Sequence, residues 1–97
     1  MRRLKFHAAA RIELQEAFDY YESKSTGKGS KLLDEIDTVT DRIVRYALAA
    51  PAASRGARVI PVKDFEYQLV YKLKADLITI VAVMHKRRRP GYWKGRV

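Results

Sequence analysis

Residues 77–93 read Leu77-Ile78-Thr79-Ile80-Val81-Ala82-Val83-Met84, followed directly by His85-Lys86-Arg87-Arg88-Arg89-Pro90-Gly91-Tyr92-Trp93. The first eight residues are mostly apolar and rich in β-branched side chains, which predicts a fully buried strand. The chain leaves this strand into a histidine, four cations and an aromatic pair. We therefore expect a rigid strand that delivers positive charge to one edge of a sheet.

The preceding residues predict more strands. Residues 67–73 alternate so that Tyr67, Leu69, Tyr71 and Leu73 share one face, and the short link 74–76 makes this run a hairpin with the buried strand. Residues 57–63 also alternate, but Pro61 cannot donate a ladder hydrogen bond, so that strand should be an edge or bulged. Residues 3–7 favour a short additional strand.

Two amphipathic helices are expected between the first strand and the others. The apolar positions of residues 8–24 and of residues 31–49 recur at spacings of three and four. Residues 25–30 contain two glycines and hydroxyl side chains, so we expect a tight loop there, with Ser30 as the N-terminal cap of the second helix. The helices should form an αα-hairpin. The stripes are Ala10, Leu14, Ala17, Phe18 and Tyr21 in the first helix and Leu32, Ile36, Val39, Ile43 and Ala47 in the second.

The expected order is β-α-α-β-β-β, an α+β fold in which a helical hairpin packs on a small, mainly antiparallel sheet. Its 97 residues are the length of one domain, which we place at 1–97. With 47% hydrophobic residues, the chain has enough apolar material for a core.

The net charge of +9 is unevenly distributed. Residues 1–54 carry nine Lys/Arg against eight Asp/Glu, whereas residues 55–97 carry eleven against three. Such asymmetry suggests an anionic partner: RNA, DNA, an acidic protein segment or a membrane surface. A solvated face that only aids solubility is the alternative.

Several function classes are excluded by composition. The chain has no cysteine, which excludes disulfides, thiol catalysis and thiolate metal sites. Its two histidines lack nearby carboxylates with metal-ligand spacing, and no glycine-rich phosphate loop follows a strand, so we expect neither a metal nor another cofactor. No apolar run reaches about 18 residues and no secretory signal is evident, so we expect a cytoplasmic protein that does not enter a membrane.

Metal-free RNA cleavage is compatible with these residues. Arg87, Arg88 and Lys63 could stabilise charge on a phosphate, and His85 could transfer protons. Tyr92 or Trp93 could stack on an unpaired base. Alternatively, His85 is satisfied by backbone, and Tyr92 and Trp93 fold back as a lid on the core.

His7 offers a narrower possibility. If the first strand lies parallel to the last, His7 and His85 would emerge at the same edge and could act as acid and base. His7 also suits a structural role at the start of the first helix, and both possibilities stay open.

The ordered set of segments resembles the RelE/ParE superfamily of bacterial toxins. The resemblance spans almost the whole chain, although no single segment is specific. Members have a helical hairpin over an antiparallel sheet and are toxins of type II toxin–antitoxin modules, so the resemblance implies a cognate antitoxin and a toxin–antitoxin hetero-oligomer. The segments are Phe6-His7-Ala8-Ala9-Ala10, Tyr20-Tyr21-Glu22, Phe65-Glu66-Tyr67 with Tyr71, and His85 through Trp93.

Two branches of the superfamily imply different targets. RelE-like members cleave messenger RNA on the ribosome, and by position Lys63, Arg87 and Tyr92 match their phosphate-binding and C-terminal residues, with His85 as a further catalytic candidate. The lysine pair that RelE-like chains place before the sheet arginine is not evident here, where residues 58–62 intervene.

ParE-like members poison DNA gyrase through a protein contact. Phe65-Glu66-Tyr67 resembles their Phe-Pro-Tyr block, with glutamate in place of proline. We therefore favour the ParE-like, plasmid-stabilisation branch, a growth-inhibiting toxin that poisons gyrase, over the ribosome-dependent endoribonuclease. An inactive interaction or co-repressor module is the third possibility. The target or nucleic-acid contacts would be Arg58, Lys86, Arg88, Arg89 and Trp93.

Overall fold

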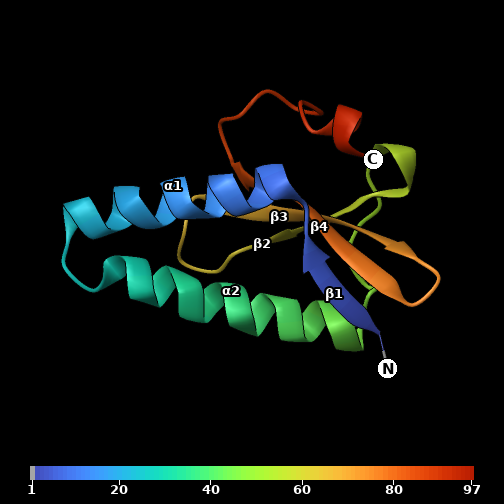
Figure 1. Ribbon diagram of the computed structural model, residues 1–97, viewed down its shortest axis with the longest axis horizontal. Helices are drawn as coiled ribbons and strands as arrows, with labels where there is room; N and C mark the ends of the chain where they lie inside the picture. Colours follow the sequence, from blue (N-terminus) through green and yellow to red (C-terminus); the bar gives the residue numbers. More distant parts are fainter. Residues whose placement is uncertain (1) are drawn as a thin grey trace.

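A computed structural model describes residues 2–97 and shows two helices against one face of a four-stranded sheet (Figure 1). The expected β-α-α-β-β-β order is confirmed. Short 3₁₀ turns at Ser54–Gly56 and Lys94–Arg96 accompany these elements. The elements are β1 (Arg3–Phe6), α1 (Ala8–Lys24), α2 (Lys28–Arg45), β2 (Arg58–Pro61), β3 (Tyr67–Lys74) and β4 (Leu77–His85).

The strand order is β1-β4-β3-β2, so the buried strand predicted at residues 77–84 lies inside the sheet. β4 pairs antiparallel with β3 and parallel with β1, and β2 is an edge strand, as Pro61 predicted. The sheet is thus mixed and mainly antiparallel. β1 ends at Phe6, opposite Ile80, so the last five residues of β4 have no strand beside them on that side.

A β-bulge in β4 allows this strand to serve two cores. Val70 pairs with Ala82 and Tyr71 with Ile80, which leaves Val81 without an opposite residue. Ile80 and Val83 therefore face the helices, whereas Val81 and Ala82 face the other side of the sheet.

The larger core lies between the sheet and the helices. α1 begins and ends as predicted, and the predicted shared face of β3 is confirmed: Leu69 and Tyr71 are buried in this core and Tyr67 and Leu73 pack against it. The Tyr71 hydroxyl donates to the Ala47 carbonyl at 2.6 Å and so ties the sheet to the chain after α2.

The predicted limits of the second helix, 31–49, are wrong at both ends, and so is Ser30 as its cap. α2 starts at Lys28 because the Glu22 carboxylate of α1 accepts hydrogen bonds from the backbone N–H groups of Gly27 and Gly29, at 2.9 and 3.0 Å. These groups would otherwise lack partners in the first turn. Gly29 also lets the helices approach, since a Cβ there would lie 2.7 Å from the Phe18 ring.

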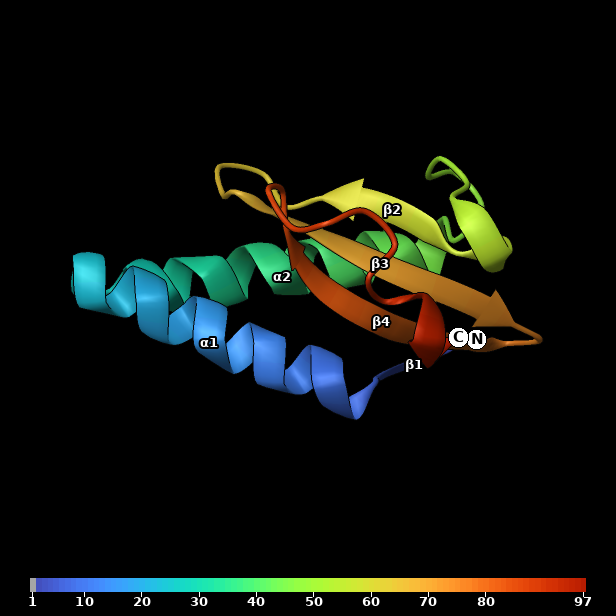
Figure 2. The same cartoon turned by 90° about the horizontal axis from the view of Figure 1, so that it is seen from above.

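The smaller core covers the opposite face of the sheet. Residues 86–97, hereafter the C-terminal segment, cross over β4 and β3 in the view of Figure 2. Trp93 from this segment is 3% exposed and packs with Val70, Val81 and Met84.

Candidate functional site

One end of the sheet carries a cluster of exposed positive charge, which we call the basic edge. The N–H of Lys86 donates to the Glu66 carbonyl at 2.9 Å, and the N–H of Val62 donates to the Tyr67 carbonyl at 2.9 Å. These bonds bring the β2–β3 loop beside the turn that follows β4. The basic edge comprises the exposed cations Lys63, Lys86, Arg87, Arg88 and Arg89, together with the half-buried His85.

The turn after β4 is built around His85. The N–H of Arg88 donates to the His85 carbonyl at 2.9 Å, and the N–H of Arg87 donates to the ring Nδ1 at 3.0 Å. The imidazole lies edge-on to Tyr67, with ring centroids 5.1 Å apart. Because Nδ1 accepts a bond, the neutral ring carries its proton on Nε2. His85 is thus half-buried and satisfied in part by backbone, the arrangement that the structural alternative predicted.

Lys63 lies in a tight loop that is held by buried neighbours. Val62 and Phe65 are 1% and 7% exposed, and the Phe65 N–H donates to the Val62 carbonyl at 3.2 Å, while Lys63, Asp64 and Glu66 remain exposed. Asp64 adopts a φ of 68°, a left-handed conformation that the loop requires. The lysine therefore reaches the basic edge from a rigid loop whose next two exposed side chains are the carboxylates Asp64 and Glu66.

Arg58 does not join the basic edge. It pairs with Tyr71, four residues along β3 from Tyr67, which places it about 13 Å away at roughly 3.3 Å per residue. Its guanidinium donates to the carbonyls of Leu48 and Ala50 at 3.3 and 2.7 Å. Arg58 therefore holds the chain after α2, and the structure separates it from the other expected contact residues.

The aromatic pair folds back onto the protein, as the lid alternative predicted. Trp93 is buried in the smaller core. The Tyr92 hydroxyl donates to the Glu13 carboxylate at 2.7 Å, and Arg88 lies over the Tyr92 ring at 4.0 Å. Burial, and secondarily the bond to Glu13, raises the pKa of Tyr92 well above its usual range. In this conformation neither side chain is free to stack on a base.

Glu13 is the residue that sequence reasoning missed. Its side chain is 10% exposed, and it accepts hydrogen bonds from Tyr92, from the N–H of Val83 at 3.0 Å and from both terminal nitrogens of Arg96 at 2.9 and 3.0 Å. This pair with Arg96 raises the pKa of the guanidinium. A signal was present, because Glu13 stands three residues after Ala10 and four before Ala17, inside the apolar stripe.

His7 and His85 do not meet, although β1 does run parallel to β4 as that hypothesis required. The N–H of His7 donates to the Ile80 carbonyl at 2.8 Å, and β4 continues five residues to His85. The His7 ring accepts the Ala9 N–H at 3.0 Å and caps α1. The expectation of a histidine pair at one edge is therefore wrong, and the structural role is confirmed.

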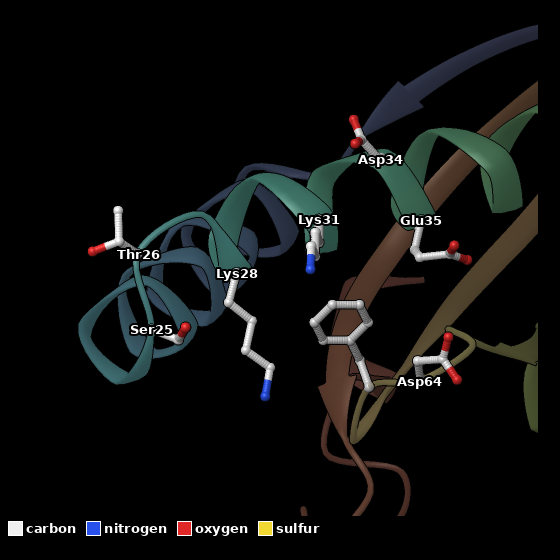
Figure 3. Close-up of a pocket in the computed structure, with 8 residues that line it drawn as sticks. Ser25, Thr26, Lys28, Lys31, Asp34, Glu35 and Asp64 are labelled. Atoms are coloured by element: carbon white, nitrogen blue, oxygen red, sulfur yellow. The ribbon is translucent and has the colours of Figure 1, made fainter.

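A polar pocket of about 360 Å³ opens beside the basic edge, between the start of α2 and the β2–β3 loop (Figure 3). Lys28 and Lys31 extend from the first turns of α2, while Glu35 and Asp64 line the pocket farther along. The pocket is lined by basic and by acidic side chains, so it is not a continuation of the positively charged surface.

An apolar groove of about 360 Å³ runs along the helical hairpin beside the end of β1. Phe6, Leu14, Phe18 and Leu33 line it together with Arg11 and Gln15. Leu33, which lines the groove, is 37% exposed, so the groove presents apolar surface to a partner. The groove is therefore a second candidate interaction surface.

Within residues 2–97, no three potential ligands from His, Cys, Asp or Glu lie close enough to hold a metal ion. The one ion pair found among the same residues joins Arg96 to Glu13, so the basic edge has no acidic partner there. No helix in this range is long and apolar enough to cross a bilayer. An exposed cationic surface of this kind is suited to contact with an anionic macromolecule.

Comparison with known proteins gives consistent matches. Residues 4–90 match the family model described as ParE toxin of type II toxin-antitoxin system, parDE. The protein Toxin ParE2 from Mycobacterium tuberculosis, strains H37Rv and CDC 1551, is 31% identical over 91 residues, which cover 93% of this chain and 87% of the relative.

The fold also matches a solved structure. A chain of the chromosomal ParDE TA system from P. aeruginosa superposes with a TM-score of 0.65, covering 88% of this chain and 96% of that one. Sequence identity is 16%, so this match bears on the fold alone.

Proposed function

The chain belongs to the ParE family of toxins of type II toxin–antitoxin systems, and from this membership we propose that it inhibits bacterial growth by poisoning DNA gyrase. The proposal includes a cognate antitoxin that neutralises it in a hetero-oligomer. Because gyrase acts on the chromosome, the proposed site of action is the bacterial cytoplasm.

The observation that carries the proposal is the basic edge. Its cations are exposed and, within residues 2–97, free of acidic partners, and they stand on turns anchored to rigid strands. Such a surface suits electrostatic contact with an acidic protein face or with DNA held by the enzyme. Recognition by a whole surface needs no proton transfer, which agrees with the engagement of Tyr92 by Glu13.

The antitoxin is proposed to use the groove of the helical hairpin. An amphipathic helix could bury Phe18 and Leu33 of this groove, and acidic residues of the same chain could cover the basic edge. The opposite sheet face is a less suitable apolar surface for the antitoxin, because Trp93 and the C-terminal segment already cover part of it.

Ribosome-dependent cleavage of messenger RNA remains the second candidate because His85 is half-exposed on the same edge as Arg87 and Lys63. In that mechanism Lys63 and Arg87 would bind phosphate and His85 would transfer protons. Tyr92, the residue matched to a C-terminal catalytic tyrosine, would first have to leave Glu13. This requirement favours the gyrase proposal.

A pair of charge-matched triple variants tests the proposal. One variant replaces Lys86, Arg87 and Arg89 of the basic edge with serine. The control makes the same replacement at three exposed cations at the far end of the sheet, Arg3, Lys5 and Lys74, so both variants lose three positive charges. With purified gyrase and plasmid DNA, the wild-type chain should block supercoiling. The basic-edge variant should be about tenfold weaker, as expected for three surface contacts.

Control and wild type should inhibit equally. A wild-type chain that leaves supercoiling unaffected, or equal losses in both triple variants, would refute the proposal. Cleavage of messenger RNA in a ribosome-containing translation reaction, abolished by Lys63→Ala and by Arg87→Ala, would instead establish the endoribonuclease.

A further inference from the structure

The free side of β4 is completed by side chains instead of by a strand. β1 ends at Phe6, opposite Ile80, so backbone groups beyond that point have no strand partner on this side. The N–H of Val83 donates to Glu13 at 3.0 Å, and the carbonyl of Val81 accepts from Arg96 at 3.1 Å. An unpaired buried N–H or carbonyl would cost free energy, so these two side chains take over the role of the missing strand.

Glu13 and Arg96 also hold the C-terminal segment in place. Their forked ion pair joins α1 to the end of the chain, and the Tyr92 hydroxyl donates to the same carboxylate at 2.7 Å. Both contacts are charge-assisted, which makes them stronger than neutral hydrogen bonds. One carboxylate therefore fastens two points of the C-terminal segment.

Tyr92 links the Glu13–Arg96 ion pair to the basic edge. Arg88 lies over its ring at 4.0 Å and Arg96 at 5.1 Å, distances at which the negative ring face attracts a guanidinium. Arg88 is exposed and is otherwise attached only through the turn after His85. The position of the Tyr92 ring thus sets the direction in which Arg88 points.

We propose that Glu13 is a positioning residue for the basic edge, because it fixes Tyr92 and through it the orientation of Arg88. This inference rests on the proposed function, since the basic edge is the surface assigned to the target. Glu13 itself is buried, so any effect that it has on the target must pass through Tyr92 and Arg88. Tyr92 and Arg96 lie beyond residues 4–90, which match the family model. The match therefore does not itself account for the contacts that Glu13 makes with these two residues.

The first test compares Glu13→Gln with Glu16→Gln, a control that neutralises an exposed carboxylate on the same helix. NMR should show that the Arg88 side-chain protons lose their upfield ring-current shift in Glu13→Gln and keep it in Glu16→Gln. Trp93 is the only tryptophan of the chain, so its fluorescence reports release of the C-terminal segment. Acrylamide should quench this fluorescence more strongly in Glu13→Gln than in wild type, and to the same extent in Glu16→Gln as in wild type.

Activity is measured in the same variants as loss of bacterial viability after induction. We expect the loss to be reduced about tenfold in Glu13→Gln and unchanged in Glu16→Gln. An unshifted Arg88 spectrum and unchanged quenching in Glu13→Gln would overturn the proposal. Full toxicity despite a lost ring-current shift would overturn it as well.

A second pair of variants covers the case in which Glu13→Gln fails to fold. Tyr92→Phe keeps an aromatic ring but loses the bond to Glu13, whereas Tyr92→Leu removes the ring as well and leaves the Glu13–Arg96 pair intact. Toxicity should fall further in Tyr92→Leu than in Tyr92→Phe, and equal toxicity would contradict the proposal. A wild-type chain without effect on growth would overturn the proposed function, while the spectra would still decide whether Glu13 orients Arg88.

Discussion

At the scale of single residues, Glu13 and Arg58 differ most from what their charge suggested, because charged side chains are expected at the surface and both of these support the fold. A glutamate on a helix is usually solvated, yet Glu13 is buried with four donor atoms around it. Arg58 belonged to the expected contact surface and instead supports the chain after α2. Charge type predicts a solvent or target contact, whereas backbone groups left without partners recruit particular side chains, and only the fold reveals those groups.

The Tyr92 hydroxyl gives a prediction at this scale. Burial and the Glu13 bond raise its pKa above the ordinary 10.0, so the stability that Tyr92 contributes is complete below pH 10 and is lost as the pH rises further. The reason is that unfolded tyrosine ionises near pH 10 while the folded side chain keeps its proton. Urea unfolding at about pH 8 and about pH 10.5 should show a smaller loss in Tyr92→Phe than in wild type.

Tyr67 and Tyr71 also have pKa values raised by burial, so part of the alkaline loss should persist in Tyr92→Phe. If the variant loses as much stability as wild type between these pH values, Tyr92 does not hold its proton in the folded chain.

At the scale of elements, periodicity predicted the helices and strands well, and their limits less well. β3 and α1 follow directly from apolar spacing, and β4 follows from a nearly continuous apolar run. The start of α2 does not, because its cap comes from Glu22 on another helix. The bulge at Val81 was equally invisible, since a buried strand that is apolar on both faces gives no alternation to reveal a change of face.

The cap of α2 is testable by a matched pair of substitutions. Glu22→Ala removes the acceptor for two N–H groups and should lower the free energy of unfolding by about 1–2 kcal/mol. Ser30→Ala changes an exposed helical residue and should stay within about 0.5 kcal/mol. Urea denaturation measures both. The opposite order of effects would mean that Ser30 is the cap after all.

At the scale of the whole molecule, the predicted charge asymmetry corresponds to a definite surface. The sequence indicated cations at one edge, and the structure brings Lys63 beside the turn of residues 85–89 through the bond between Lys86 and Glu66. The C-terminal segment was harder to place, because Tyr92 and Trp93 were equally compatible with base stacking and with a lid. Burial of Trp93 against the smaller core distinguishes these two arrangements.

The target itself is decided most directly by pulse-labelling DNA and protein synthesis in bacteria during the first minutes after the chain is induced without an antitoxin. Gyrase poisoning predicts that DNA synthesis fails first while incorporation of amino acids continues. Earlier failure of protein synthesis would contradict it and make His85, Lys63 and Arg87 catalytic candidates on the ribosome. Unimpaired growth would contradict both and indicate an interaction module without toxicity.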